Sequence, residues 1–428
     1  MQQKEKRVVV TGYGMITPIG KDSRQTFENA KNGVSGISLL SSFETEGLPC
    51  RIGGQVDDSG LNDFTAKGLQ GIEKCSSRGL KLMISAVSEA AESAGLDSIQ
   101  NRNRIGVSLG YHGENPSVED LVLLHRYGGA GVWDVSGLTK TGVYSFFNFF
   151  RRKPDVATSI LSILFNCKGS SFTIVSACAA GSQAIGEALG IIREGRADAM
   201  IAGGSESNLN FMGFVGFVLI RALSERYSSP EKASRPFDRK RNGFVMSEGA
   251  GALVLESLDH ALERKAPIFA EVLGYGSSAD AFRITDIHPK GDGAVFAMQR
   301  AIADAGLTAS DIEYINAHGT STLQNDQIET LAINRVLGER AKDVPVSSNK
   351  SMMGHTIAAA GAIEAGLTIM GMNNGIVLPT INHEFPDPKC DLDYVPNHAR
   401  KLEHGIALSN SFGFGGQNAC LCFGKFRQ

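Results

Sequence analysis

The sequence is poor in several features that mark particular classes of protein. Its 428 residues include one tryptophan and 13 prolines, and 42 Lys and Arg residues stand against 45 Asp and Glu, for a net charge of −3. This balance lacks the basic excess that nucleic acids and anionic membranes attract. The longest apolar stretches, residues 143–150 and 211–220, are too short or too interrupted by glycine for a membrane span, which needs about 20 residues. We therefore expect a protein that binds no nucleic acid and inserts into no membrane.

Targeting and cofactor motifs are scarce as well. Only three consecutive aliphatic residues stand near the N-terminus, whereas a signal peptide has about 7–15 apolar residues in its core, so we expect a cytoplasmic location. The seven cysteines show no regular spacing, and Cys420-x-Cys422 has no second ligand pair for zinc. The segment from Val8 to Thr17 begins like a dinucleotide fingerprint, but Thr17 replaces the third glycine and Pro18 follows. Reduced thiols, no metal site and no bound dinucleotide are expected.

Glycine is abundant, at 50 of 428 residues, and short β-branched runs alternate with alanine-rich helical patterns. This alternation predicts an α/β fold. We expect strands at residues 7–11, 105–109, 172–175, 199–202 and 252–255, and helices at residues 80–94 and 183–193.

The pattern of elements occurs twice along the chain. A helix near residues 82–94 precedes the strand 105–109, and a helix at 295–305 precedes a strand at 312–316 in the same way. We interpret the repeat as two diverged α/β halves, residues 1–265 and 266–428, and chance similarity among Ala/Gly-rich helices is the alternative. No linker composition marks the seam, so we expect the halves to share one body. Two equivalent helix N-termini would then meet near a common axis, where a site can form.

Cys178 lies where a predicted strand, residues 171–175, gives way to a helix that begins at Ala179. A sulfur at this junction faces unsatisfied backbone N–H groups and the positive end of the helix, which favours the nucleophilic thiolate. Small neighbours such as Ala177 and Ala180 leave room for a substrate. A buried cysteine that acts only as a small hydrophobic residue explains the segment equally well.

Two histidines occupy similar positions at the ends of predicted elements. His318 follows the strand near residues 312–315, and His355 opens a helix through Ala365. At a helix N-terminus the dipole disfavours the imidazolium and leaves a neutral hydrogen-bond donor. The segment Asn410–Gly416 ends in Gly-Phe-Gly-Gly, whose main-chain N–H groups can form half of an oxyanion hole. A bulged strand explains this last segment as well.

Three segments, in this order, resemble those of one enzyme family: Cys178, Ala317-His318-Gly319-Thr320-Ser321-Thr322, and Lys350-Ser351-x-x-Gly354-His355. The family is that of the elongating β-ketoacyl-acyl-carrier-protein synthases, and the resemblance covers nearly the whole chain. The sequence is similar to the Cys-His-His class and unlike the initiating synthases, which have Asn in place of the second His. The resemblance implies a thiolase-like fold, with two pseudo-duplicated α/β halves in a layered α-β-α-β-α arrangement.

The resemblance also implies a reaction. Cys178 would take an acyl group from a carrier-protein thioester. His318 and His355 would stabilise the enolate that forms when malonyl-carrier protein loses carbon dioxide. The enolate would attack the acyl group and give a 3-oxoacyl chain two carbons longer, as in fatty-acid elongation. The backbone N–H groups of Cys178 and Phe414 would hold the second oxyanion. Phe414 also resembles the family's gate residue, which swings as the acyl pocket fills.

Further residues receive supporting roles from the same resemblance. Lys350 would orient the site, with Glu329 as its ion-pair partner and Asp326 in the same network. Thr320 and Thr322 would hydrogen-bond the phosphopantetheine arm. The resemblance implies an acyl carrier protein as partner, acyl and malonyl thioesters as substrates and a homodimer, or a heterodimer for a specialised enzyme. No metal or organic cofactor is expected, because the carrier's own arm brings the substrate.

The sequence departs from the family pattern around the acyl pocket. Alanines follow Cys178 where the family has a hydroxyl residue, and the segment 110–116 lacks the usual small Gly/Ser run. Residues 111–168 are rich in aromatic residues, Tyr144, Phe146, Phe147, Phe149 and Phe150. The acyl chain length is therefore left open. The run Arg151-Arg152-Lys153 is either a contact for an acidic carrier protein or a solvated charge cluster.

Three alternatives compete with fatty-acid elongation. A specialised ketosynthase of a polyketide, polyene or unusual-lipid pathway fits the altered pocket segment. A non-condensing partner subunit, like a chain-length factor, lacks the nucleophile, so Cys178 argues against it. A degradative thiolase would need a second thiol, Cys420 or Cys422, and the segments at 350–355 and 412–416 disfavour that function.

Overall fold

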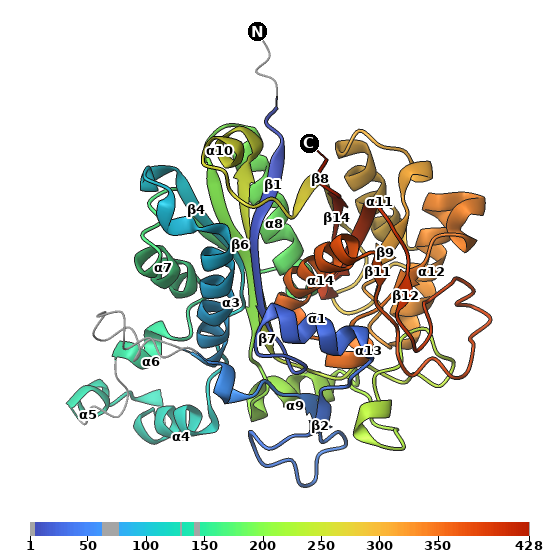
Figure 1. Cartoon of the computed structure of the whole chain (residues 1–428). Coiled ribbons are helices and arrows are strands. Elements are labelled where there is room, and N and C mark those ends of the chain that lie inside the picture. Colours follow the sequence, from blue (N-terminus) through green and yellow to red (C-terminus); the bar gives the residue numbers. More distant parts are fainter. Residues whose placement is uncertain (1–4, 62–76, 129–130, 141–145, 428) are drawn as a thin grey trace.

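The computed structural model describes residues 5–61, 77–128, 131–140 and 146–427 (Figure 1). Tyr144, one of the aromatic residues named above, lies outside this part of the chain. Strands and helices alternate as predicted, and the N-terminal half, blue to green, lies beside the C-terminal half, orange to red. Among the described residues, no helix is both long and apolar enough to cross a membrane.

The first half contributes five strands to the central sheet, in the order β5-β4-β6-β7-β1. The β5–β4 and β4–β6 pairs are parallel, and the β6–β7 and β7–β1 pairs are antiparallel. The strands are β1 (Val8–Ile16), β4 (Ile105–Gly110), β5 (Ser171–Ile174), β6 (Ala199–Glu206) and β7 (Gly249–Ser257).

The second half repeats this topology in the order β10-β9-β13-β14-β8, again with two parallel pairs followed by two antiparallel ones. Its strands are β8 (Ala270–Ala279), β9 (Tyr314–Asn316), β10 (Val346–Ser347), β13 (Ile406–Phe412) and β14 (Gln417–Gly424). Because strand order and direction agree throughout, the prediction of two pseudo-duplicated α/β halves is confirmed.

The two sets of strands form one ten-stranded sheet through a short β1–β8 contact, where Val9 pairs with Glu271 and Val10 with Ala270. The residue boundary predicted at 265 falls between α10 (Leu258–Glu263) and β8. One apolar core contains residues of both halves, such as Leu253 and Leu421. The halves therefore share one body, as the missing linker predicts.

Two glycine pairs let helices rest directly on the first strand of each half. A Cβ at Gly12 or Gly14 would lie 2.2 Å from a carbonyl oxygen of α3 (Arg78–Ala94). At Gly274 and Gly276 it would lie 2.3 and 2.0 Å from carbonyl oxygens of α11 (Asp292–Asp304). The Gly12-x-Gly14 spacing that imitates a dinucleotide fingerprint thus serves packing.

Two helices form the middle layer, α8 (Ala180–Arg193) and α14 (Ala360–Asn374). Every residue of α14 from Ala360 to Met372 is buried. Both helices pack against each other and against strands of both halves, whereas α3 covers β1 and β7, and α11 covers β8 and β14 (Figure 1). The five strands of each half thus lie between the central helices and one outer helix, which gives the predicted α-β-α-β-α layering.

The remaining elements are α1 (Ser23–Lys31), β2 (Ile37–Leu39), β3 (Ile52–Gly54), α7 (Pro154–Leu164), α9 (Phe211–Leu219), α12 (Leu323–Leu337), α13 (Lys350–Met353), β11 (Ile376–Val377) and β12 (Arg400–Lys401).

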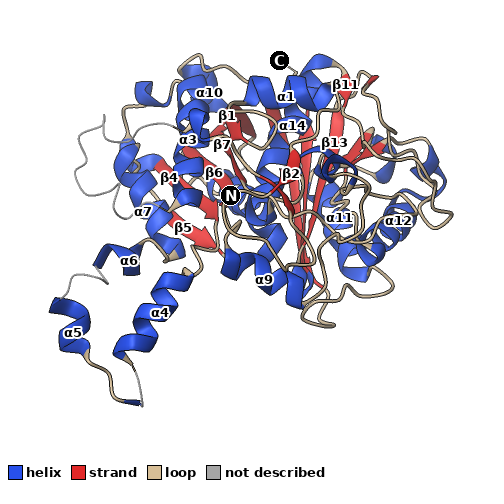
Figure 2. Cartoon of the chain, turned by 90° about the horizontal axis from the view of Figure 1, so that it is seen from below, coloured by secondary structure: helices blue, strands red, loops and turns tan. Residues whose placement is uncertain are grey.

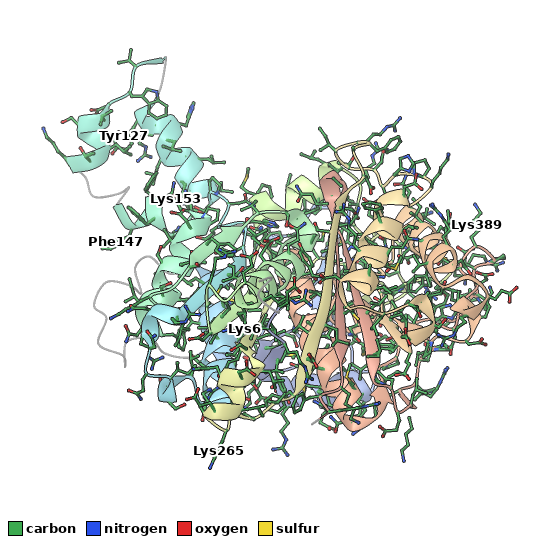
Figure 3. All side chains as sticks on the ribbon, turned by 90° about the horizontal axis from the view of Figure 1, so that it is seen from above. Lys6, Tyr127, Phe147, Lys153, Lys265 and Lys389 are labelled. Atoms are coloured by element: carbon green, nitrogen blue, oxygen red, sulfur yellow. The ribbon has the colours of Figure 1, made fainter. Side chains whose placement is uncertain are left out.

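An arm projects from the body beyond the β4–β5 edge of the sheet (Figures 2 and 3). It consists of α4 (Val118–Tyr127), α5 (Val135–Lys140) and α6 (Phe146–Phe150). Its surface carries large apolar side chains that are exposed, among them Val122, Val132, Trp133 and Phe149.

Candidate active site

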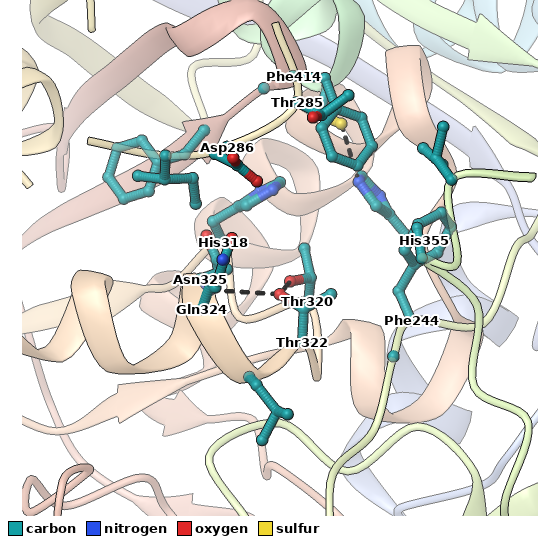
Figure 4. A pocket seen from close by; sticks show the side chains of 18 of the residues that line it. Phe244, Thr285, Asp286, His318, Thr320, Thr322, Gln324, Asn325, His355 and Phe414 are labelled. Atoms are coloured by element: carbon teal, nitrogen blue, oxygen red, sulfur yellow. Dashed lines mark hydrogen bonds between the residues drawn. The ribbon is translucent and has the colours of Figure 1, made fainter. Parts of the chain in front are cut away.

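A pocket of about 320 Å³ opens where segments from both halves meet (Figure 4). Cys178 follows β5, His318 follows β9 and Phe414 follows β13, each just beyond the C-terminal end of its strand. His355 lies in the turn between α13 and α14. Four residues that the sequence places on separate segments therefore line one cavity.

Cys178 lies on a strained turn. Ala177 has a φ of 47°, in the left-handed region that a residue with a Cβ rarely adopts. A short 3₁₀ turn, Ala177–Ala179, then leads into α8 at Ala180. The side chain of Cys178 is buried, and the backbone N–H groups of Phe414 and of Cys178 itself approach its sulfur.

The structure contradicts the predicted thiolate. Burial raises the pKa of Cys178 from 9.0 to about 12, and the nearby Lys350 and the two backbone N–H groups lower it only in part. The helix end and the amides are present as predicted, but the desolvation of a fully enclosed sulfur outweighs them. In the free protein Cys178 is therefore a thiol at neutral pH.

His355 is a hydrogen-bond donor to this sulfur. Its Nε2 lies 3.0 Å from Cys178 Sγ, and its Nδ1 accepts the backbone N–H of Ile357 at 3.2 Å. Because Nδ1 is occupied as an acceptor, the neutral ring carries its proton on Nε2. Burial, assisted by Lys350, lowers the pKa of His355 well below 6.5, so the ring is neutral as predicted.

His318 provides a second neutral imidazole. Its ring centroid lies 5.2 Å from that of His355, nearly perpendicular to it, and the pocket lies between the two side chains (Figure 4). Burial first, then Lys350 and His355, lower the pKa of His318 well below 6.5. Nitrogen and sulfur atoms of Cys178, His318 and His355 all lie within 4.8 Å of one another, so one small group can touch all three.

Glu329 and Asp326 hold the backbone around His318. Glu329 accepts the N–H groups of His318 and Gly319, both at 2.8 Å, and the side chain of Asn410 at 3.2 Å. Burial raises the pKa of Glu329 to about 7.

Asp326 accepts the N–H groups of Phe237 and Ser321, and its Oδ2 lies 3.4 Å from Arg241 Nε. Both carboxyl groups therefore act on loop geometry and lie away from the reacting sulfur.

The predicted Lys350–Glu329 ion pair is wrong. Lys350 Nζ instead lies 2.5 Å from Oε1 of Glu364 on α14, and both side chains are buried. Glu329 is already saturated by backbone N–H groups, whereas the Glu364 carboxyl extends from the middle of a helix and pairs with the ammonium. Glu364 is a lone acid in an apolar helix, and this pattern is the signal that could have identified it.

The Gly-Phe-Gly-Gly segment forms a turn at the pocket, as expected if its main-chain N–H groups face a ligand. Gly415 has a φ of 80°, which glycine adopts without strain, and Gly415 N–H donates to the Ile284 carbonyl at 2.6 Å. The ring of Phe414 lines the pocket (Figure 4) and packs against the apolar cluster that contains Cys178. Its centroid lies 6.4 Å from that of Phe217. This turn places an aromatic side chain and a backbone N–H group at the same sulfur.

Thr320 and Thr322 line the same pocket and hydrogen-bond each other through their hydroxyl groups at 3.0 Å. Cys420 and Cys422 are buried in β14 and do not line it, so neither of them supplies the second thiol of a thiolase. All nine predicted site residues are therefore placed: Cys178, His318, Thr320, Thr322, His355 and Phe414 line the pocket, and Asp326, Glu329 and Lys350 support it.

The three basic residues at 151–153 are engaged within the chain. Arg151 pairs with Glu114 at 3.3 Å, and Arg152 forms an ion pair with the buried Asp120. Lys153 lies over the ring of Phe149, 5.4 Å from its centroid. Neither interpretation of this cluster from the sequence included these internal partners.

Comparisons with known proteins agree with this arrangement. Residues 5–261 match the N-terminal domain and residues 269–384 the C-terminal domain of beta-ketoacyl synthase. The 3-oxoacyl-[acyl-carrier-protein] synthase 2 of Staphylococcus aureus (strain COL) is 42% identical over 430 residues, covering 99% of each chain, and that of Synechocystis sp. is 41% identical over 428. A beta-ketoacyl synthase from Burkholderia phymatum superposes with a TM-score of 0.88 at 34% identity, covering 99% of this chain and 100% of that one. A chain of the structure AntDE:AntF, a type II PKS acyl-carrier protein in complex with its ketosynthase, superposes with a TM-score of 0.86 at 35% identity, covering 99% of this chain and 100% of that one.

The duplicated fold and the Cys-His-His site define a condensing enzyme of the thiolase-like class. With both domains of the family matched in order, the chain belongs to the beta-ketoacyl synthase family of acyltransferases.

Proposed function

We propose that this protein is a β-ketoacyl-[acyl-carrier-protein] synthase that joins an acyl group to malonyl-carrier protein by decarboxylative Claisen condensation. The observation that carries the proposal is the contact between Cys178 Sγ and the Nε2 of a neutral His355, 3.0 Å apart, with His318 facing the same space. A nucleophile with two uncharged donors is what an acyl transfer followed by enolate chemistry requires.

In the first step the sulfur of Cys178 attacks the carbonyl carbon of an acyl-pantetheine thioester. The N–H groups of Cys178 and Phe414, which already face the sulfur, stabilise the oxyanion of the tetrahedral intermediate. The bond to the pantetheine sulfur then breaks, and the proton of the Cys178 thiol ends on the departing pantetheine thiol. Acyl-Cys178 remains.

In the second step malonyl-carrier protein enters, and its thioester oxygen accepts hydrogen bonds from His318 and His355. The carbon–carbon bond to the carboxylate breaks, carbon dioxide leaves, and the electron pair becomes an enolate on the thioester. Both rings are neutral, so each offers an N–H donor where negative charge develops. The enolate carbon attacks the carbonyl carbon of acyl-Cys178, the carbon–sulfur bond breaks, and Cys178 leaves as a thiolate that takes up a proton from water.

The supporting residues prepare this geometry. Burial first, and then the charge of Lys350, keep both imidazoles unprotonated, and the same charge favours an anionic sulfur at Cys178. The ion pair with Glu364 holds the Lys350 ammonium in place. Thr320 and Thr322 offer hydroxyl groups to the amides of the pantetheine arm, and Phe414 acts as the gate beside the sulfur. Nucleophile, donors and oxyanion hole all come from the chain, so the proposed reaction uses no metal and no organic cofactor.

Fatty-acid elongation is the first candidate pathway, because the curated relatives at 42% and 41% identity are named 3-oxoacyl-[acyl-carrier-protein] synthase 2. A specialised polyketide or polyene pathway is the second candidate. Two observations favour it: charged residues replace the small residues expected after β4, and solved neighbours include a ketosynthase with its type II PKS carrier protein and a ketosynthase/chain length factor.

The proposed partners are an acyl carrier protein and a second copy of this chain. Among the described strands β5 is the last one of the sheet, so one side of its backbone pairs with no strand in that part of the chain. Val175 beside it is 59% exposed, and the arm next to it exposes Trp133 and Val132. Burying these groups against an identical edge would stabilise a homodimer, and a related subunit would do the same in a specialised enzyme.

The test is intact-mass measurement after mixing the protein with acyl-carrier proteins and, separately, malonyl-carrier protein. The expected result is one acyl mass on the wild type, none on Cys178→Ala, and a 3-oxoacyl product only when both carriers are present. Acylation without condensation would contradict the proposed second step. No acylation from any donor would overturn the proposal and favour a non-condensing partner subunit.

A further inference from the structure

The two halves differ in one connection between equivalent strands. Residues 207–248 join β6 to β7, whereas residues 413–416 alone join the equivalent strands of the second half, β13 and β14. A short turn is therefore enough to connect such a pair of strands. The long connection of the first half leaves its own strands and contacts segments of the second half, so strand connection alone does not explain its length.

We define residues 234–247 of this connection as the brace. Two of its N–H groups hold Ser321, which belongs to the loop that carries His318. The Arg235 N–H donates to Ser321 Oγ at 3.0 Å, and the Gly243 N–H donates to the Ser321 carbonyl at 3.1 Å. The brace is therefore bonded to the side chain and to the main chain of that loop.

Arg241 extends the same contact to the start of α12. Its buried guanidinium donates to the carbonyls of Thr322 at 3.1 Å and Leu323 at 3.2 Å, and its Nε lies 3.4 Å from Asp326 Oδ2. Its Nη1 donates to Asp387 Oδ2 at 2.7 Å. Because Thr322 and Leu323 line the pocket, the brace also fixes this wall of the pocket.

Both ends of the brace hold the segment that carries His355. At the C-terminal end, the His355 N–H donates to the Val245 carbonyl at 2.7 Å, and the Ser247 N–H donates to the His355 carbonyl at 3.0 Å. At the N-terminal end, Ser234 Oγ donates to the Lys350 carbonyl at 2.6 Å. One segment of the first half thus holds both histidine-bearing segments of the second half.

Phe237 packs directly against the loop that carries His318. A Cβ at Gly319, the next residue, would lie 3.1 Å from Phe237 Cε2. The Phe237 N–H donates to Asp326 Oδ2 at 2.7 Å. Its fully buried ring stacks on that of Tyr394, with 4.0 Å between the centroids and 10° between the planes. The main chain next to His318 therefore rests on a stacked pair of rings.

These contacts hold an unfavourable backbone. Phe237 has a φ of 63° and Ser321 a φ of 71°, in the left-handed region that residues with a Cβ rarely adopt. Asp326 accepts the N–H groups of both, at 2.7 and 3.2 Å. Strained residues persist only where the surrounding structure determines their conformation, and they cluster at functional sites. Tertiary contacts therefore hold the backbone around His318, and the loss of one contact should shift it.

We propose that the brace sets the position of the two imidazoles toward each other, and that Phe237 is a positioning residue for decarboxylation that acts through His318. This proposal rests on the proposed condensation. Two N–H donors must point at one developing oxyanion, so a small displacement of one ring weakens its stabilisation. Acyl transfer uses the N–H groups of Cys178 and Phe414 instead, and Phe237 belongs to a different apolar cluster from Cys178.

The experiment measures two rates at saturating carrier protein: acyl transfer to Cys178, and carbon dioxide release from malonyl-carrier protein by the acylated enzyme. Phe237→Leu is expected to slow carbon dioxide release by about tenfold or more and to leave acyl transfer within about twofold. Phe423→Leu makes the same truncation at an equally buried ring in β14 and should leave the ratio of the two rates unchanged. Urea unfolding of each variant shows that folded proteins are compared.

Ser234→Ala is a milder change, because it removes one hydrogen bond to the Lys350 carbonyl and no ring. It should lower carbon dioxide release relative to acyl transfer by about threefold, in line with the loss of a single hydrogen bond. If Phe237→Leu does not fold, Ser234→Ala decides the question alone.

Three outcomes would each overturn the proposal: equal losses of both rates in Phe237→Leu, an unchanged ratio in Ser234→Ala, or an equal shift of the ratio in Phe423→Leu. Phe237 would then be an ordinary core residue. If the wild type shows neither acyl transfer nor carbon dioxide release, the proposed function fails. If the wild type performs both steps and the ratio does not change in the two brace variants, only the positioning role fails.

Discussion

Ala177 and Ile357 adopt the same left-handed backbone, with φ of 47° and 43°, and each precedes the first residue of its central helix by three positions. The next residue is Cys178 in the first half and Ala358 in the second. The duplicated turn thus carries a nucleophile in one copy only. In the other copy, Ile357 N–H fixes the Nδ1 of His355, whose Nε2 faces Cys178. Two equivalent strained turns therefore serve a single Cys–His pair.

The close approach of these two turns depends on Gly181. A Cβ there would lie 2.7 Å from the Ala358 carbonyl oxygen, a backbone atom that cannot move aside cheaply. Gly181→Ala is expected to lower the free energy of unfolding by about 1–3 kcal/mol through overpacking, and to slow acyl transfer by shifting Cys178. Urea denaturation and the intact-mass assay measure the two effects.

Gly190 provides the matched control because it lies on the same helix, where an added Cβ would meet no atom within 4 Å beyond the backbone of its own helix turn. Gly190→Ala is expected to be neutral or to stabilise by up to about 1 kcal/mol, as in an open helical position. If the two variants lose stability equally, then general helix effects and not the contact with Ala358 determine the outcome at Gly181.

The buried ion pair between Lys350 and Glu364 gives the second prediction. Lys350→Met should destabilise the protein by about 3–5 kcal/mol, because it leaves the Glu364 carboxyl buried and uncompensated. Adding Glu364→Leu should recover most of that loss. Thermal or urea unfolding of the two single variants and the double variant measures the coupling.

A parallel double-mutant cycle between Lys350 and Glu329 is the control. No hydrogen bond or ion pair joins these two described residues, so their coupling should be close to zero, within about 0.5 kcal/mol. A large Lys350–Glu329 coupling together with a small Lys350–Glu364 coupling would restore the pairing expected from the sequence.

The sequence predicts the fold and the pocket well because both depend on local signals. Gly and small residues at strand ends mark the turns that carry Cys178, His318 and Phe414, and the repeat of elements predicts the duplication. These signals predict the structure reliably because the conformation of a turn depends mainly on residues that are neighbours in the chain.

The partners of buried charges could not be predicted in this way. Glu364 lies 14 residues from Lys350 on another helix, and Glu206 lies 94 residues from His112. In the sequence several carboxylates are possible partners for the same positive charge, and only the tertiary packing determines which of them forms the ion pair. The prediction of a low pKa for Cys178 is wrong for a related reason. The helix end, which lowers the pKa, can be recognised in the sequence, whereas the desolvation that raises it depends on the closed pocket.

The third prediction concerns the pH dependence of Cys178 alkylation. With a pKa of about 12, the thiolate is a minor form throughout the neutral range and grows tenfold for each pH unit. The rate of iodoacetamide labelling at Cys178, followed by peptide mass, should therefore rise steadily from about pH 7 to about pH 9.5 without a plateau. A plateau near neutral pH would support the low pKa expected from the helix end alone.

The fourth prediction separates the roles of the two histidines from that of the sulfur. His318→Ala and His355→Ala each remove one donor from the site where the enolate forms, so each should slow malonyl decarboxylation by roughly 10²–10³-fold. Acyl transfer to Cys178 should fall much less, because its oxyanion faces the N–H groups of Cys178 and Phe414. Carbon dioxide release and acyl mass, measured on the same samples, distinguish the steps, and His125→Ala on the exposed face of α4 is the control. Equal losses in both steps would mean that the histidines act on the sulfur itself, with His355 serving as a base toward the Cys178 thiol.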